Sequence, residues 1–304
     1  MAFMAVNPTQ PTHDIMNQST NAISYIRLKY VKSINEIITG GALSGRSINN
    51  SNYRELINER VKAIMKRLVG TYSCNSISNL VRDVNAHMDQ VRDALIGLGY
   101  EKIIDSTFIL TSRLAIGLSN PYMEALELGI AWDPIANLPY IPSTSLRGAL
   151  ESSPSAAPCL TALSPVNARK SPVEASPVVV LDSYPTYCPS GRGLLSIDII
   201  NPHYREVEGA ISETDVSPTP LPFLTVSKGI GFRVVIMANR KRVKHKVMVK
   251  CKTDAPGDYI YAAQMGNECQ GMCTAQVLIE ALKGAFIKGL GAKTALGYGR
   301  FSTK

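Results

Sequence analysis

The sequence has no apolar run long enough to cross a membrane. Its unbroken hydrophobic runs, such as residues 178–181, fall far short of the roughly 20 residues that a transmembrane helix needs. The first residues show no cationic segment followed by a long apolar stretch, so no secretory signal is indicated. We therefore expect a cytoplasmic protein that does not contact a membrane.

Closely spaced cysteines are also missing, because the six cysteines form no Cys-x-x-Cys motif. The nearest two, Cys269 and Cys273, have no histidine close by, whereas a structural zinc site takes four ligands at tighter spacing. We expect no metal, no cofactor, and thiols that are buried or free. The cysteines are Cys74, Cys159, Cys188, Cys251, Cys269 and Cys273.

Groups for acid–base catalysis are scarce. The four histidines stand alone, and the spacing shows no Ser-His-Asp or paired-carboxylate arrangement. His203 and His245 could serve in RNA cleavage, whereas His13 and His87 are typical of surface or packing positions. A lone histidine is more often structural than catalytic, so we predict no active site.

Positive charge is abundant, and it is concentrated near the C-terminus. The chain has a net charge of +8. Residues 1–150 carry 14 Lys and Arg against 12 Asp and Glu, whereas residues 225–304 carry 14 against 4. This imbalance indicates a polyanionic partner, most simply nucleic acid. A solubilising surface is the alternative.

Helices are predicted wherever apolar residues recur every three or four positions. Gly40-Gly41 is expected to end the first helix, and Asn52 with Glu55 to form a capping box for the second. Gly289 follows the last helix as a typical C-terminal residue. The predicted helices cover residues 23–38, 56–68, 80–98 and 274–288.

Apolar residues begin to alternate with polar ones near Ser106, which indicates strands. Residues 152–177 are rich in Ser, Ala and Pro and predict a flexible insertion. The chain is thus divided into a helical region over residues 1–105 and a mixed α/β body over 106–304. The predicted strands cover residues 108–118, 178–181, 194–200, 232–237 and 243–251.

Residues 138–148 contain a candidate anion site at the start of a helix. Ser143, Thr144 or Ser145 can cap this helix, whose free N–H groups and partial positive charge suit a phosphate. Arg147 adds a bidentate donor in the first turn. Most Ser and Thr caps are only caps, so the segment gains weight from a second candidate site.

That second candidate is a glycine loop, residues 289–301, with the sequence Gly-Leu-Gly-Ala-Lys-Thr-Ala-Leu-Gly-Tyr-Gly-Arg-Phe. Glycines lack Cβ, so another backbone or a phosphate chain can approach closely. Lys293, Thr294 and Arg300 supply charge and a hydroxyl. Nucleotide hydrolysis is excluded, because Ala292 stands where a phosphate-cradling loop needs glycine and the helix precedes the loop. The glycines are Gly289, Gly291, Gly297 and Gly299.

Residues 240–252 alternate between cationic and largely apolar positions, which predicts a strand with one basic face. The functional interpretation is a surface that follows a phosphate backbone. The alternative is a lysine-rich edge strand protected against aggregation. The cations assigned to RNA here are Arg240, Arg242, Lys244 and Lys246.

Five segments of the chain are informative as an ordered set: residues 140–148, 181–185, 201–204, 218–220 with 223–226, and 289–301. Together they resemble the RAMP superfamily of CRISPR proteins, and within it the sixth RAMP subunit of the type III-B, or Cmr, effector complex. The resemblance covers about residues 107–304 and does not use the helical region. Ser143 departs from the family, whose members commonly have glycine there.

The resemblance implies an α+β, ferredoxin-like core related to the RRM fold. In that fold the glycine loop and the Ser-Leu-Arg helix start lie close together and contact the guide RNA backbone. Members cap one end of a filament of backbone RAMP subunits, near the 3′ part of the guide, beside a second capping RAMP subunit. Target cleavage belongs to the backbone subunits, so the resemblance implies no enzyme activity here. Residues 203–220 could form the thumb that splays guide–target duplexes.

Three functions remain open. The leading interpretation is a non-catalytic RNA-binding subunit of this antiviral ribonucleoprotein, in which Tyr298 could stack on a base or else fill the sheet core. The second is a metal-independent RAMP endoribonuclease that processes guide RNA precursors with His203 or His245. The third is an assembly protein whose helical region docks on its neighbours.

Overall fold

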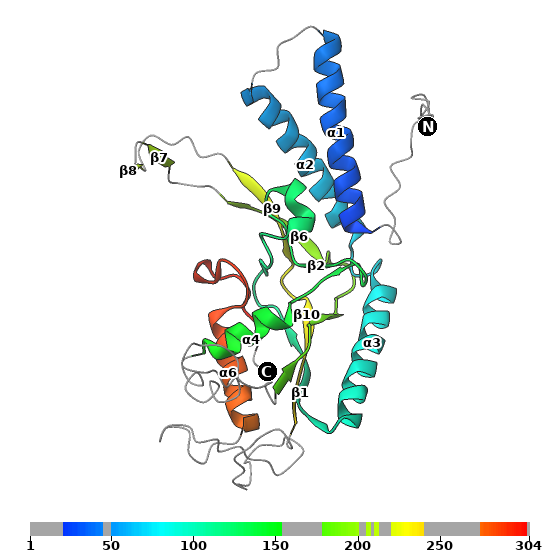
Figure 1. The fold of residues 1–304 in the computed structure, drawn as a ribbon, viewed down its shortest axis with the longest axis vertical. Coiled ribbons are helices and arrows are strands. Elements are labelled where there is room, and N and C mark those ends of the chain that lie inside the picture. Colours follow the sequence, from blue (N-terminus) through cyan, green and yellow to red (C-terminus); the bar gives the residue numbers. More distant parts are fainter. Residues whose placement is uncertain are drawn as a thin grey trace.

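A computed structural model shows an α+β body from which two long helices, α1 and α2, project at one end (Figure 1). The α+β class expected from the sequence is confirmed. None of the described helices is long and apolar enough to cross a membrane. The structure describes residues 21–44, 50–153, 178–200, 205–207, 210–212, 220–239 and 274–302.

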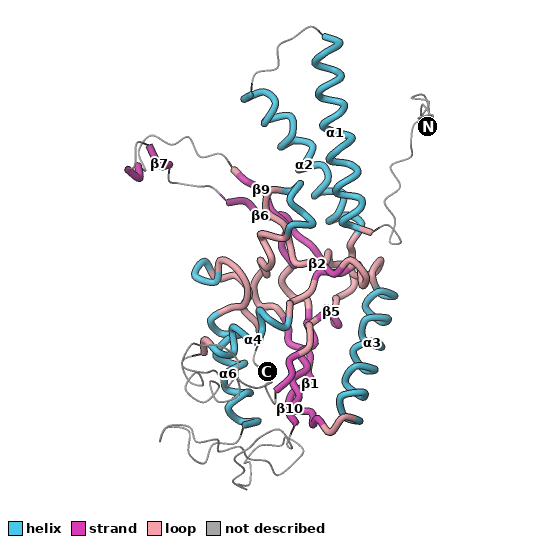
Figure 2. The backbone as a smooth tube through the Cα atoms, in the orientation of Figure 1, coloured by secondary structure: helices cyan, strands magenta, loops and turns pink. Residues whose placement is uncertain are grey.

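The main sheet is antiparallel and is built around β10 (Gly231–Asn239). One edge of β10 pairs with β1 (Tyr100–Ile109), and the other with β4 (Val178–Val180) and β5 (Tyr184–Tyr187). Nearly every residue of β10 is buried, because helices cover both faces of the sheet. Figures 1 and 2 place α3 on one face and α4 with α6 on the other.

Among the described residues, three two-stranded units accompany the main sheet. The first joins β6 (Leu195–Ile200) to β9 (Leu221–Val226), and a short hairpin joins β2 (Trp132–Asp133) to β3 (Leu138–Pro139). The third pairs β7 with β8 inside the segment predicted as a thumb. The bounds of these last two strands are Arg205–Val207 and Ala210–Ser212.

The predicted helices are present, with two corrections at their ends. Gly40 and Gly41 lie inside the first helix, because a helical glycine costs only about 1 kcal/mol relative to alanine. The second helix already begins at Asn50, so Asn52 lies in its first turn and cannot be its cap. The helices are α1 (Ala22–Ser44), α2 (Asn50–Thr71), α3 (Ser78–Gly97), α4 (Ser143–Glu151) and α6 (Thr274–Lys288), with 3₁₀ turns η1 (Pro121–Leu126) and η5 (Thr294–Leu296).

The first strand of the body begins earlier than its alternation suggested. It starts at Tyr100 and ends at Ile109, so the predicted boundary at 105/106 falls within β1. A register shift between Lys102 and Ile104 interrupts the two-residue period and hides the first half of the strand. The rest of the predicted strand, residues 110–118, forms only isolated bridges, at Leu110, Leu114 and Ala115. The division into two domains stays a prediction.

The helical region and the body share one continuous hydrophobic core. The start of α1 is fixed by Asn137, whose Oδ1 accepts hydrogen bonds from the Ala22 backbone N–H at 3.0 Å and from Trp132 Nε1 at 3.2 Å. The Trp132 ring also meets the Tyr72 ring edge-on, with centroids 4.9 Å apart. Buried polar and aromatic contacts therefore anchor the projecting helices.

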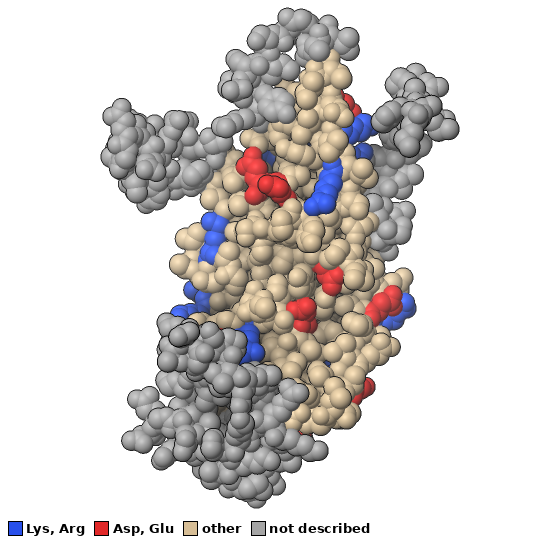
Figure 3. Space-filling view, viewed as in Figure 1, with Lys and Arg blue, Asp and Glu red and all other residues tan. Residues whose placement is uncertain are grey.

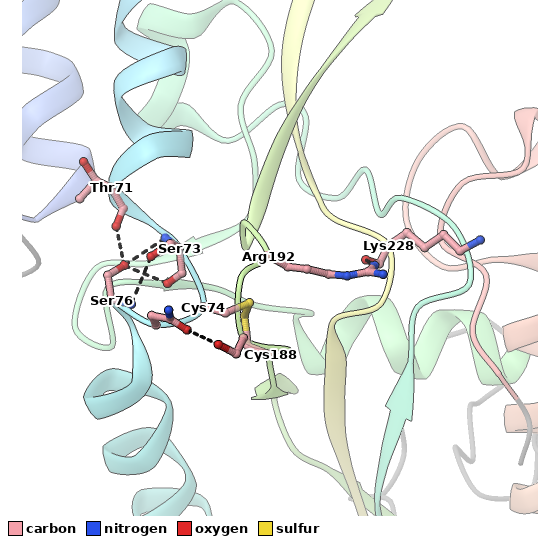
Figure 4. Close-up of a disulfide and its surroundings, with 9 residues drawn as sticks. Thr71, Ser73, Cys74, Ser76, Cys188, Arg192 and Lys228 are labelled. Atoms are coloured by element: carbon pink, nitrogen blue, oxygen red, sulfur yellow. Dashed lines mark hydrogen bonds between the residues drawn. A yellow bond between two sulfur atoms is a disulfide. The ribbon is translucent and has the colours of Figure 1, made fainter.

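A disulfide joins Cys74 to Cys188, so the expectation of free thiols is wrong for these two residues (Figure 4). The chain around Cys74 pairs with the segment after Cys188, because Cys74 N donates to Arg192 O and Leu194 N donates to Tyr72 O, each at 2.9 Å. The cysteines are 114 residues apart, and connectivity over such a distance cannot be deduced from spacing. The other four cysteines lie outside the described residues.

An ionic cluster fastens α3 to the sheet. Arg233 on β10 donates to Asp105 on β1 at 2.7 Å and to Asp89 on α3 at 2.8 Å, and Arg92 on α3 reaches Asp105 at 3.1 Å. Burial by itself would raise the pKa of Asp105, but the hydrogen bonds from Arg233 and Arg92 outweigh it. The pKa of Asp105 therefore lies below its ordinary value.

Several predictions fall on residues outside the described part of the chain. These include most of the insertion at 152–177, the histidines His203 and His245, and the strand at 243–251. They also include the four basic-strand cations assigned to RNA, namely Arg240, Arg242, Lys244 and Lys246.

Candidate nucleic-acid interface

The first turn of α4 is capped by a distant carboxylate. The N-cap is Pro142, and Asp182 Oδ1 accepts a hydrogen bond from the Ser143 backbone N–H at 2.6 Å. The expectation that Ser143, Thr144 or Ser145 caps this helix is therefore wrong. A carboxylate at the positive end of the helix dipole takes the place that a phosphate would favour.

Arg147 lies on α4 and forms an ion pair with Glu151 one turn later, with Nε and Oε1 3.0 Å apart. Both side chains are well exposed, so the pair contributes little to stability. Glu151 nevertheless offsets the charge that Arg147 would present to an anion. The assignment of Arg147 to phosphate binding remains a prediction.

Three of the four loop glycines allow close backbone packing. Gly289 ends α6 with φ 103°, and its N–H donates to Ala285 O at 2.8 Å, as expected for a residue just past a helix. A Cβ on Gly291 would collide with the carbonyl oxygen of Ala115, and one on Gly299 would collide with that of Leu290. The groups that approach these glycines are therefore protein backbone.

Backbone hydrogen bonds fix the glycine loop to the segment that follows β1. Ala292 N donates to Ala115 O at 2.7 Å, and Gly299 N donates to Arg113 O at 2.8 Å. Thr111 N donates to Arg300 O, also at 2.8 Å. A loop anchored at several points presents its side chains in fixed positions, as a binding site needs.

Three cations of this loop region, which we call the loop cations, have no acidic partner among the residues that the structure describes. Blue side chains gather along the edge of Figure 3 that corresponds to the C-terminal loop in Figure 1. Unpaired cations on a rigid loop can bind phosphate without first breaking an ion pair. The loop cations are Lys288, Lys293 and Arg300.

Arg113 is a neighbouring cation that the sequence analysis did not assign to the site. Its Nη1 lies 3.1 Å from Asp198 Oδ2 on β6, and its carbonyl accepts the hydrogen bond from Gly299. Only the pairing of the loop with residues 113–115 brings it here, and no local signal indicates that pairing. Lys228, in the turn before β10, also points toward the side on which the loop lies (Figure 4).

The side chain of Tyr298 makes its contacts within the protein. Its hydroxyl donates to Asp198, and its ring centroid lies 6.2 Å from that of Phe223. Burial and the bond to Asp198 both raise the pKa of the Tyr298 hydroxyl above its ordinary value. The contacts agree with the packing interpretation, and stacking on a base stays a prediction.

A cleft of about 800 Å³ opens where α4 meets the glycine loop. Ser145 and Gly148 line it from α4, and Gly289, Gly291 and Thr294 line it from the loop. Its third wall consists of residues 116–119 and 127–128. The two segments that the sequence analysis singled out are therefore neighbours in space.

No protein-family model matches the chain. In sequence the chain is 25% identical over 248 residues to the CRISPR system CMR subunit Cmr6 of Saccharolobus solfataricus strain P2, covering 80% of this chain and 72% of that protein. In sequence the chain is therefore similar to a subunit of the CRISPR CMR system. This similarity agrees with the Cmr part of the resemblance drawn from its motifs.

The fold is shared with a chain in a cryo-EM structure of the type III-B Cmr-β bound to cognate target RNA. The TM-score is 0.62 at 21% identity, and the alignment covers 93% of this chain and 90% of that one. The crystal structure of Cmr6 from Pyrococcus furiosus aligns with a TM-score of only 0.33, at 19% identity over 67% of this chain and 97% of the other. The shared fold is therefore shown by the first alignment.

Proposed function

We propose that this protein is a non-catalytic RNA-binding subunit of a type III-B CRISPR effector complex. It caps one end of the filament of backbone RAMP subunits, beside a second capping RAMP subunit. There it holds the 3′ part of the guide RNA and the paired target RNA. Its RRM-related, ferredoxin-like core would provide the contact surface.

The loop cations beside the cleft carry this proposal. Lys288, at the end of α6, and Lys293 and Arg300, on a loop anchored by backbone bonds, offer positive charge without acidic partners in the described part of the chain. Such a surface suits a phosphate backbone, because phosphate contacts position RNA without reading its sequence. The relationship to Cmr6 makes RNA the first polyanion to test.

Contacts with other Cmr subunits are supported by the projecting helices. Leu28, Val31 and Ile38 on α1 are each more than half exposed. They recur at helical spacing, so they lie near one face of α1. An apolar face on a projecting helix is suited to burial against another subunit.

RNA binding is tested by a gel-shift titration of the full chain with labelled single-stranded RNA across a range of salt concentrations. The Lys293→Ala/Arg300→Ala variant should bind more weakly. Its plot of log affinity against log salt should become shallower by about 0.7 for each phosphate that the variant no longer neutralises. A denaturing gel run in parallel should show intact RNA, whereas cleaved RNA would favour the endoribonuclease.

A matched control is Lys62→Ala/Lys66→Ala, which removes the same charge from exposed positions on α2. The control should bind as the unmodified protein does. Equal losses in both variants would show that only net charge matters. Unchanged affinity and salt dependence in the loop variant would contradict the assignment of the loop cations.

A further inference from the structure

The cleft between α4 and the glycine loop combines opposite charges, which a simple phosphate site does not need. Lys288 lines it from the last residue of α6, and Glu127 lines it from the third wall. A carboxylate repels phosphate and only accepts hydrogen bonds. The part of the cleft beside Glu127 therefore suits a ligand group that donates a hydrogen bond.

Glu127 is also held in an uncommon backbone conformation. It follows η1 with φ 62° and ψ −51°, the rare conformation of a classic γ-turn, which the hydrogen bond from Leu128 N to Leu126 O closes at 2.7 Å. Lys293, between the lining residues Ala292 and Thr294, has φ 59°. Such conformations gather at functional sites, where the surrounding structure maintains them. Asn137, the third described case, anchors α1 instead.

Hydroxyl groups complete the lining. Ser145 and Ser152 contribute from α4, and Thr294 from the loop. The Ser152 hydroxyl already donates to Ala149 O at 3.0 Å, which leaves its oxygen as an acceptor. The cation suits the phosphate of a nucleotide, and the carboxylate and the hydroxyls suit its sugar hydroxyl. The volume of about 800 Å³ lies in the range of small-ligand sites.

We propose that the cleft holds one ribonucleotide of the bound RNA and distinguishes RNA from DNA. Its phosphate lies toward Lys288, and its ribose 2′-hydroxyl donates to Glu127, with the Ser145 hydroxyl as a second partner. The 2′-hydroxyl is the group by which a protein separates RNA from DNA at one position. This inference rests on the proposed RNA binding and adds a chemical preference to it.

The test measures the affinity of the full chain for RNA and DNA strands of one sequence at one salt concentration, by fluorescence anisotropy. The unmodified protein should prefer RNA by about tenfold, as expected for a hydrogen bond to a charged acceptor. Glu127→Gly tolerates the positive φ of this position and should remove most of the preference by weakening RNA binding. Lys293→Ala should weaken binding of both strands and keep their ratio.

An unchanged RNA-to-DNA ratio in Glu127→Gly would overturn the inference, while salt-sensitive RNA binding would leave the proposed function standing. Absence of binding to either strand by the unmodified protein would overturn both. If Glu127→Gly melts at a lower temperature by circular dichroism, Ser145→Ala supplies a second test on α4. A reduced preference in Ser145→Ala supports the inference, and an unchanged one overturns it.

Discussion

The disulfide between Cys74 and Cys188 should be a major source of stability. It closes a loop of 114 residues, and restriction of the unfolded chain over that length corresponds to about 5 kcal/mol in the chain-entropy treatment. The backbone of residues 72–74 already pairs with that of residues 192–194. The folded protein therefore needs little rearrangement without the bond, and the loss falls mainly on the unfolded state.

We expect Cys74→Ala/Cys188→Ala to lower the melting temperature by roughly 10 °C or more, because each kcal/mol shifts it by about 2–4 °C in a large domain. The assay is thermal unfolding followed by circular dichroism, with and without a reducing agent. The reducing agent should destabilise the unmodified protein by a similar amount. It should change the double variant little, which separates this bond from any effect of the other cysteines.

Equal melting temperatures for the two proteins, with thiol titration showing the bond formed in the unmodified one, would refute this reasoning. That result would mean that the unfolded chain is already restrained over residues 74–188. Limited proteolysis provides a second measurement. Without the bond, cleavage between α2 and α3 should become faster, because local opening there would no longer be covalently limited.

Three further predictions concern charge, glycine and capping. Because the pKa of Asp105 is lowered in the folded state, its ionised carboxylate stabilises the fold above about pH 4. This stabilisation is lost as the pH falls through the folded-state pKa. Asp105→Asn should therefore show a smaller fall in melting temperature between pH 5 and pH 2. Gly291→Ala should lower the free energy of unfolding in urea by about 1–3 kcal/mol, because φ is 86° and the new Cβ would collide with Ala115. The control Gly148→Ala lies in open space on α4 and should be neutral or slightly stabilising. Asp182→Ala should cost about 1 kcal/mol by the same assay through the lost cap of α4, and no change would show that solvent replaces it.

Local patterns in the sequence were enough to locate most of the described elements. The apolar spacing of residues 80–98 predicted α3, and α6 has the predicted bounds of Thr274–Lys288. The central strand β10 was predicted over residues 232–237 and extends from Gly231 to Asn239. These elements are determined by neighbours three or four residues apart, or by a run of adjacent residues, so a single sequence contains the information.

The role of the glycine loop was only half determined by the sequence. Four glycines required close approach by something, and the sequence allowed either backbone or phosphate. In the structure the backbone of Ala115 approaches Gly291, and the backbone of Leu290 approaches Gly299. Lys293 and Arg300, however, were identified directly from their residue types, whereas Lys288 was not assigned to the site from the sequence.

Tertiary structure alone decided the features that depend on pairs far apart in the chain. The bond from Cys74 to Cys188, the cap that Asp182 gives to Ser143 and the position of Arg113 beside the loop all join segments separated by dozens of residues. Which distant residues meet depends on how the sheet and helices pack as a whole, and hydrophobic periodicity does not encode those pairings. The residues thus specify the chemistry available, and the packing specifies where that chemistry is assembled.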